Sequence, residues 1–166
     1  MKFCPYCGAN LVLKKIEDRE RECCPQSGCR FVHWNSPVPV VAGIIETEHG
    51  VVLAHNKAWP PGIYSMIAGY LEAGETPEDA IIRETREELG LTARGPNLVG
   101  TYAYPNKNQL ILAYHLFAEG EIVLNEELDE YRLMTKRTLR GWPFGQDALP
   151  GWPFGAGTAI TDWLKQ

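Results

Sequence analysis

The sequence predicts an α/β chain, of the mixed α+β kind, with a small cysteine-bearing module at its N-terminus. Apolar, β-rich runs separated by turn residues alternate with two segments that carry helix signals, which is typical of this fold class. All five cysteines fall within the first 29 residues. Because 166 residues suffice for one sizeable core and a small appendage, we expect two domains, residues 1–34 and residues 35–166.

Five strands are expected in the larger domain from their apolar runs. Turn residues separate the first two runs, and residues 57–65 are expected to form a loop. The fourth run is apolar on both faces, so it should be a central strand that is covered on each side. The runs are residues 40–46, 50–56, 98–105, 109–121 and 131–136.

A helix is expected between Thr76 and Gly90. Thr76 can cap the first turn, Pro77 suits the first helical position, and Gly90 can adopt the left-handed conformation that ends a helix. A second helix is expected over residues 157–166, at the end of the chain.

Three carboxylates crowd one side of the first helix. A solvated helix face usually pairs Glu with Lys or Arg four residues on, but Glu84 has Glu88 at that position, and Arg83 can pair with Glu87. These anions also lie toward the C-terminal end, where the helix dipole disfavours them by about 0.3–1 kcal/mol each. A solvated face is one interpretation. A divalent cation bound by the hard carboxylate oxygens explains better why the helix carries these unfavourably placed charges.

The composition restricts the class of partner. The formal net charge is -5 at pH 7, which argues against nonspecific binding of nucleic acid by a basic surface. The first ten residues lack the apolar core of a signal peptide, and no apolar run approaches the roughly 18 residues of a membrane span. We therefore expect a soluble, cytoplasmic chain that does not associate with membranes.

Residues 69–91, GYLEAGETPEDAIIRETREELGL, resemble the Nudix box, GX5EX7REUXEEXGU, in which U is a bulky apolar residue. Every fixed letter is present, and Thr85 is the departure, at a U position. The resemblance implies a Nudix hydrolase whose fold is an α/β/α sandwich with a mixed β-sheet. It also implies a Mg²⁺- or Mn²⁺-dependent enzyme that cleaves the diphosphate bond of a nucleoside diphosphate linked to another group.

The same resemblance assigns roles to individual residues. The carboxylates that match metal ligands, one of which would act as general base, are Glu84, Glu87 and Glu88. A backbone carbonyl of Ala68 or Gly69 would complete the metal shell, and Arg83 would pair with Glu75 to hold the helix against the loop before it. Glu127 matches a further metal ligand. The alternative for that segment is a solvated acidic loop, because residues 126, 129 and 130 are acidic too.

The cysteines favour a metal site over disulfides in a reducing compartment. Cys4 and Cys7 form a C-x2-C pair, and Cys24 and Cys29 form a second, wider pair, which together fit a tetrahedral structural Zn²⁺ site. Cys23 competes with Cys24. We prefer Cys24 because a proline follows it, as one follows Cys4. Such an ion would stabilise a segment that is too small to form a hydrophobic core of its own.

A four-cysteine ribbon before a Nudix domain resembles the NADH pyrophosphatase branch of the family, as do residues 31–41 and 67–75. This branch implies NADH, NAD or ADP-ribose type substrates and a homodimer. Two alternatives stay open. One is a hydrolase of modified nucleoside triphosphates or of NAD-capped RNA; the other is a ligand sensor without catalysis whose ribbon binds a partner. The intact box argues against the sensor.

The substrate contacts are harder to predict. Residues 102–109, YAYPNKNQ, stand where the branch carries SQPWPFPxS, and they share a proline and aromatic character with it. Tyr102 and Tyr104 could stack on a base and Lys107 could meet a phosphate, or the segment is a strand end followed by a polar turn. The repeated GWPFG, at 141–145 and 151–155, is interpreted as a Pro/Gly loop, and the Gly-rich entry to the last helix could bind a phosphate.

Overall fold

The computed structural model describes residues 1–141 and 154–166, which fold as two units, Met1–Ser36 and Pro37–Gln166. The copies of GWPFG lie largely outside the described residues, so the loop predicted for them stays a prediction. Within the described ranges, no helix is both long and apolar enough to cross a bilayer.

The N-terminal unit is a three-stranded antiparallel sheet with very little apolar core. Its strands, in the spatial order β1-β2-β3, are Val12–Ile16, Arg19–Cys23 and Val32–His33. The buried side chains of residues 1–36 are those of Cys4, Cys23 and Cys24. Because so few apolar side chains are buried, hydrophobic burial alone stabilises this unit only weakly.

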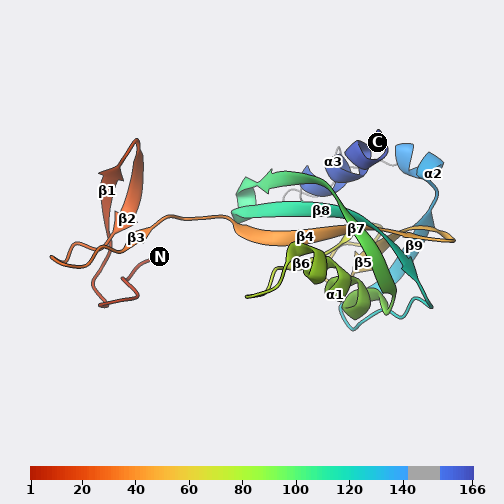
Figure 1. The fold of residues 1–166 in the computed structure, drawn as a ribbon, viewed down its shortest axis with the longest axis horizontal. Helices are drawn as coiled ribbons and strands as arrows, with labels where there is room; N and C mark the ends of the chain where they lie inside the picture. Colours follow the sequence, from red (N-terminus) through yellow and green to blue (C-terminus); the bar gives the residue numbers. More distant parts are fainter. Residues whose placement is uncertain (142–153) are drawn as a thin grey trace. The chain divides into compact units, whose positions relative to one another are not determined.

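The larger unit is built on a six-stranded sheet (Figure 1). Five strands follow the order β7-β8-β4-β5-β9, and β6 pairs with the part of β4 that β5 leaves open. β4 and β8 run parallel and the other pairs are antiparallel, so the predicted mixed sheet is confirmed. The strands are β4 (Val38–Thr47), β5 (Gly50–Asn56), β6 (Ile67–Tyr70), β7 (Thr92–Tyr104), β8 (Gln109–Glu119) and β9 (Leu128–Met134).

β8 is the central strand that its sequence predicts. It lies between β7 and β4, and Ala113 and Leu116 are buried in the cores on opposite faces of the sheet. Three strand starts differ from the prediction, that of β4 by only two residues, and β6 was not predicted as a strand. β7 begins at Thr92 because polar residues before the apolar run still pair with β8, and β9 begins at Leu128 because it continues its ladder with β5.

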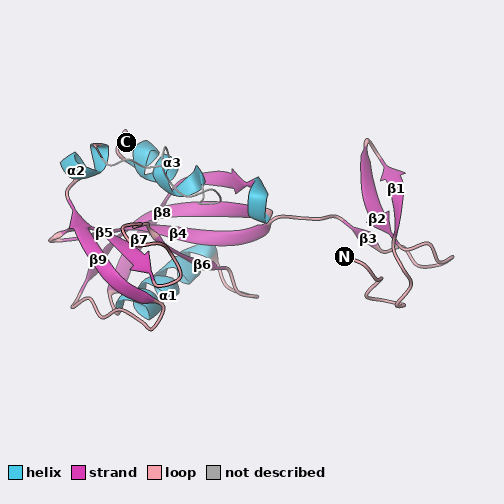
Figure 2. Cartoon of the chain, turned by 180° about the vertical axis from the view of Figure 1, so that it is seen from behind, coloured by secondary structure: helices cyan, strands magenta, loops and turns pink. Residues whose placement is uncertain are grey.

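Helices cover both faces of the sheet, which gives the three layers implied by the resemblance (Figures 1 and 2). The helix α1 (Pro77–Leu89) packs on one face and buries Ile81 there. The helix α3 (Phe154–Trp163) packs on the opposite face and buries Ile160. The predicted sandwich and both predicted helices are therefore confirmed, although α3 begins and ends three residues earlier than the predicted range 157–166.

The ends of α1 are set as the sequence predicts. The Thr76 hydroxyl accepts a backbone N–H of the first turn, and Gly90 ends the helix at φ 70°. A short helix, α2 (Lys136–Arg140), was not predicted. Thr135 caps it by accepting the Thr138 N–H, so the chain turns helical at the end of β9.

Candidate functional site

The box places α1 directly against β6. A side chain on Gly69 would overlap the carboxylate of Glu84, so glycine is what allows this close approach. Thr85 does not disturb the arrangement. It is fully buried, and its hydroxyl donates to the Ile81 carbonyl at 2.7 Å, which satisfies the polar group within the helix.

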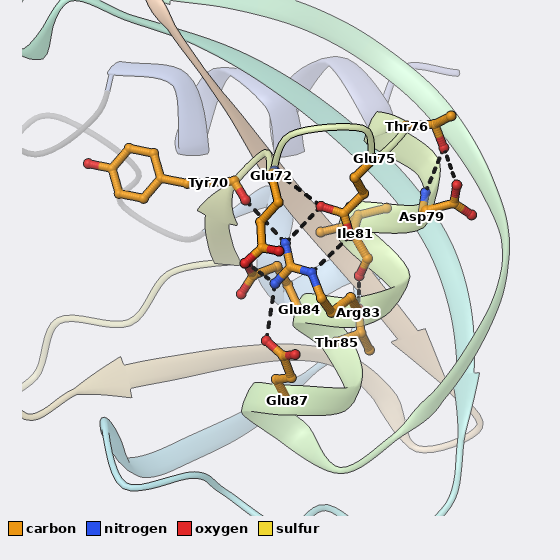
Figure 3. A network of polar contacts seen from close by, with 10 residues as sticks. All are labelled: Tyr70, Glu72, Glu75, Thr76, Asp79, Ile81, Arg83, Glu84, Thr85 and Glu87. Atoms are coloured by element: carbon orange, nitrogen blue, oxygen red, sulfur yellow. Dashed lines mark hydrogen bonds and ion pairs between the residues drawn. The ribbon is translucent and has the colours of Figure 1, made fainter.

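Arg83 is the centre of a network that joins the helix to the loop before it (Figure 3). Its Nε and Nη2 donate to the two oxygens of Glu75 at 2.9 and 3.0 Å, the bidentate pairing that the resemblance implied. Nη1 donates to Glu84 at 2.7 Å and to Glu87 at 3.1 Å, and Nη2 also reaches the Tyr70 carbonyl. All five N–H donors are used. The network lowers the pKa of Glu75 and raises that of Arg83.

Glu88 is the member of the cluster that Arg83 does not reach. Among the described residues, no cation pairs with its carboxylate. Burial, followed by the negative charges of Glu84, Glu127 and Glu87, raises the pKa of Glu88 to about 8. The like-charge crowding expected from the sequence is present, but burial is the larger cause.

A pocket of about 120 Å³ opens beside this carboxylate. Glu88 and Glu127 both line it, so residues from α1 and from the segment before β9 meet there. The rest of the lining is mostly apolar, as is typical of pockets for small molecules. The other lining residues are Ala42, Ala54, Asn56, Trp59, Ser65, Met66, Ile67, Ala68, Ile111 and Leu128.

The structure separates the four acidic residues before and in β9. Glu127 lines the pocket, whereas Asp129 contacts His55 and Glu130 contacts Tyr64. The backbone carbonyl of Glu126 accepts a hydrogen bond, but its side chain does not line the pocket. Of these acids, Glu127 is therefore the one placed to share a cation with Glu88.

The N-terminal unit contains the second candidate metal site. The Sγ atoms of Cys4, Cys7, Cys24 and Cys29 all lie within 4.8 Å of one another. Cys23 points elsewhere and donates to the Arg21 carbonyl, so the structure assembles the four thiols preferred from the sequence. Burial opposes ionisation of Cys4, but hydrogen bonds from backbone N–H groups lower its pKa to about 7. These four sulfurs could hold a zinc ion.

The predicted substrate contacts do not line the pocket. Tyr104 is 2% exposed and offers no ring face to a base. The Tyr102 hydroxyl donates to Asp162, and Lys107 ends a 3-10 turn, Pro105–Lys107. None of the three lines the pocket. The strand end and polar turn considered for this segment describe it better.

Asn56 and Trp59 are among the pocket residues that the sequence analysis did not predict. They belong to the end of β5 and to the loop after it, and the pairing of β5 with β9 brings them close to Glu127. A tryptophan in a Pro/Gly loop just before the box was the available signal.

The chain was compared with known proteins. Residues 36–151 match the family model described as the NUDIX domain. The NAD-capped RNA hydrolase NudC of Pseudomonas aeruginosa (strain LESB58) is 34% identical over 128 residues, which cover 76% of this chain and 44% of that protein. NudC of Stutzerimonas stutzeri (strain A1501) is 32% identical over 133 residues, covering 79% and 47%. The chain thus spans about half the length of the curated relatives it matches.

Solved structures share the fold. A NUDIX hydrolase from Nitrosomonas europaea superposes with a TM-score of 0.77 at 24% identity, covering 99% of this chain and 91% of that one. A NUDIX family hydrolase from Clostridium perfringens gives a TM-score of 0.60 at 18% identity, covering 78% and 97%. Because the family model covers most of the chain, from the end of the cysteine module through the box, this protein belongs to the NUDIX family.

Proposed function

We propose that this chain is a Mg²⁺- or Mn²⁺-dependent pyrophosphatase that hydrolyses the diphosphate bond of a nucleoside diphosphate linked to another group. The observation that carries the proposal is the meeting of Glu88 and Glu127 in one pocket whose remaining walls are mostly apolar. Carboxylates at one end of an apolar pocket suit a ligand with a phosphate part and a ring part.

The chemistry of the donor set suits a hard divalent cation, although among the described residues it is the four cysteines, and not these carboxylates, whose ligand atoms already lie close together. Carboxylate oxygens come from Glu84, Glu87, Glu88 and Glu127, and Ala68 or Gly69 can add a backbone carbonyl. The raised pKa of Glu88 supports the fit, because a buried carboxylate among like charges gains most from a bound cation. When bound, such an ion supplies positive charge that offsets the diphosphate and favours attack by water.

The side chains of the box hold one another in position, and one of them accepts a proton. Arg83 fixes Glu84 and Glu87 through one guanidinium, so their carboxylates are positioned before substrate arrives. A carboxylate of this α1 set accepts the proton of the attacking water. Glu75 holds Arg83 in place from the loop, which makes it a positioning residue for the cluster.

We propose NADH, NAD or ADP-ribose as the substrate type. The names of the curated relatives support an NAD-type substrate, and they support the NAD-capped end of an RNA as a second candidate. The net charge of -5 favours the small molecule, because it provides no general attraction for an RNA chain. The complete set of carboxylates in the box argues against a sensor without catalysis.

We also propose that Cys4, Cys7, Cys24 and Cys29 bind a structural Zn²⁺, and that the cysteine module and the Nudix domain are separate domains. The four-sulfur donor set and the near absence of an apolar core in residues 1–36 support this assignment.

Product analysis tests the function. The protein is incubated with Mg²⁺ or Mn²⁺ and with NADH, NAD, ADP-ribose, a dinucleoside polyphosphate, an oxidised nucleoside triphosphate and an NAD-capped oligonucleotide. We expect AMP and reduced nicotinamide mononucleotide from NADH, and no products from Glu88→Gln. Turnover of the triphosphate alone would support the housecleaning alternative. Binding of metal without turnover of any compound would contradict the proposal.

A further inference from the structure

We propose that His55 is a positioning residue of this site, which ties the loop carrying Trp59 to the segment carrying Glu127, so that both segments line one pocket. Only the expected effect on catalytic rate rests on the proposed function. The tie that His55 makes between the two segments is a property of the protein without substrate.

A β-bulge provides the starting geometry. In the β5–β9 ladder, His55 pairs with Glu130 and Asn56 pairs with Leu128, so Asp129 is an extra residue without a ladder partner. A bulge redirects the side chain of the extra residue. Here Asp129 reaches the ring of His55, with Oδ1 2.6 Å from Nδ1.

The other ring nitrogen of His55 holds the loop. Nε2 lies 3.1 Å from the carbonyl of Pro60, the residue after Trp59. A carboxylate and a carbonyl are both acceptors, so both bonds form together when each ring nitrogen carries a proton, and the hydrogen bond to Asp129 raises the pKa of His55 in that direction. His55 is 7% exposed and packs edge-on against the Trp59 ring at a centroid distance of 6.3 Å. One side chain therefore fixes both segments.

Lys57 provides a parallel tie between the same two segments. Its backbone N–H donates to the Glu127 carbonyl at 2.9 Å, and its Nζ donates to the Glu126 carbonyl at 2.6 Å. Both tied segments line the pocket, through Trp59 from the loop and Glu127 from the other segment. The loop that carries Trp59 and the segment that carries Glu127 are thus held at a fixed distance from each other. A substrate that joins a ring to a diphosphate needs such a fixed distance between the group that contacts its ring and the group that binds the cation.

The first test uses the chain without substrate and without Mg²⁺. The five tryptophans are labelled with 5-fluorotryptophan, and the Trp59 signal is identified in the ¹⁹F NMR spectrum with Trp59→Phe. We expect the Trp59 signal to shift or broaden in His55→Ala and in Asp129→Ala. It should stay in place in Asp129→Asn, because the amide can accept from Nδ1–H or donate to an unprotonated Nδ1, and Nε2–H still donates to Pro60 in either case. An unmoved Trp59 signal in both alanine variants would overturn the inference.

His115→Ala is the matched control. His115 is also largely buried and bonded to a carboxylate, Glu46, but its ring stacks on Trp163 and does not line the pocket. This variant should move the Trp163 signal and leave the Trp59 signal unchanged. If His55→Ala does not fold, Asp129→Ala decides the question, because its side chain is 46% exposed and its removal leaves no large cavity.

Kinetics form the second test. With NADH, we expect kcat/KM to fall about 10²-fold in His55→Ala and Asp129→Ala, the loss typical of a misplaced contact of about 1 Å. Asp129→Asn and His115→Ala should keep nearly the full value. Rescue by Asn but not by Ala separates positioning from general destabilisation, and equal losses in Asn and Ala variants would contradict the inference. If the wild type hydrolyses nothing, the proposed function fails while the ¹⁹F result still decides the role of His55.

Discussion

Replacing Glu88 by Gln should stabilise the chain when no Mg²⁺ or Mn²⁺ is bound, and the gain should grow with pH. Burial, aided by the charges of Glu84 and Glu127, raises the pKa of Glu88 from 4.5 to about 8 in the folded chain. In the unfolded chain this carboxyl ionises near its ordinary value, so the folded state binds the proton more tightly. The contribution of Glu88 to stability is therefore most favourable below pH 4.5 and is lost as pH rises toward 8.

The magnitude follows from the width of this pH interval. Each pH unit inside it removes about 1.4 kcal/mol of unfolding free energy. Over the whole interval the loss reaches at most ~5 kcal/mol, and at pH 7 it is at most ~3 kcal/mol. Glutamine has nearly the same shape and carries no charge, so it should abolish the loss. Groups such as Glu75 and His55 titrate in both proteins, and the difference between the two proteins isolates Glu88.

Urea unfolding of the two proteins at about pH 5, 7 and 8.5 measures this difference, with zinc retained and Mg²⁺ omitted. Glu87→Gln is the matched control, because it removes the same charge from an exposed position on the same helix, where the side chain is 52% exposed. Its stability should keep most of the pH dependence of the wild type, because the charge of Glu87 is the smallest of the causes that raise the pKa of Glu88. Saturating Mg²⁺ should stabilise the wild type more than Glu88→Gln. Parallel stability curves for wild type and Glu88→Gln from pH 5 to 8.5 would refute the reasoning.

Four further substitutions test the frame of the carboxylate cluster and the cysteine site. Gly69→Ala should weaken Mn²⁺ binding about tenfold or more, measured by electron paramagnetic resonance, because the new Cβ displaces the Glu84 carboxylate. Arg83→Lys should lower the unfolding free energy by about 1–3 kcal/mol in urea titrations, because an ammonium group cannot replace the five guanidinium hydrogen bonds; unchanged stability would contradict the network. Cys24→Ser should lose zinc while Cys23→Ser keeps it, as native mass spectrometry would report, and zinc loss in Cys23→Ser would reassign the ligand.

Much of the fold could be predicted because local patterns and tertiary structure agree. A few residues are enough to predict each of three features: the helix cap at Thr76, the helix end at Gly90 and the central strand β8, whose run is apolar on both faces. The strand starts at Thr92 and Leu128 could not be predicted, because ladder pairing rather than residue type extends those strands.

Some residues of the candidate site could likewise be predicted from the sequence, and others could not. Glu84, Glu87 and Glu88 share one helix, so their proximity follows from spacing alone. Trp59 and Glu127 meet only because β5 pairs with β9, and no local pattern predicts that meeting.

Two residues show the limit of assigning contacts from position in the chain. Tyr104 stands where a related branch carries its signature, yet the core buries its ring. The role of His55 depends on a bulge that leaves Asp129 unpaired in the ladder, and such a bulge has no mark in the sequence.

The most direct test of the account is the anomalous scattering of Mn²⁺ in crystals of the protein, with Glu88→Gln crystals measured in parallel. The account predicts a peak within coordination distance of the carboxylates of Glu88, Glu84 and Glu127, and its loss or marked weakening in the variant. No peak at these carboxylates at saturating Mn²⁺, or an equally strong peak in Glu88→Gln, would contradict the claim that this cluster is the cation site of the enzyme.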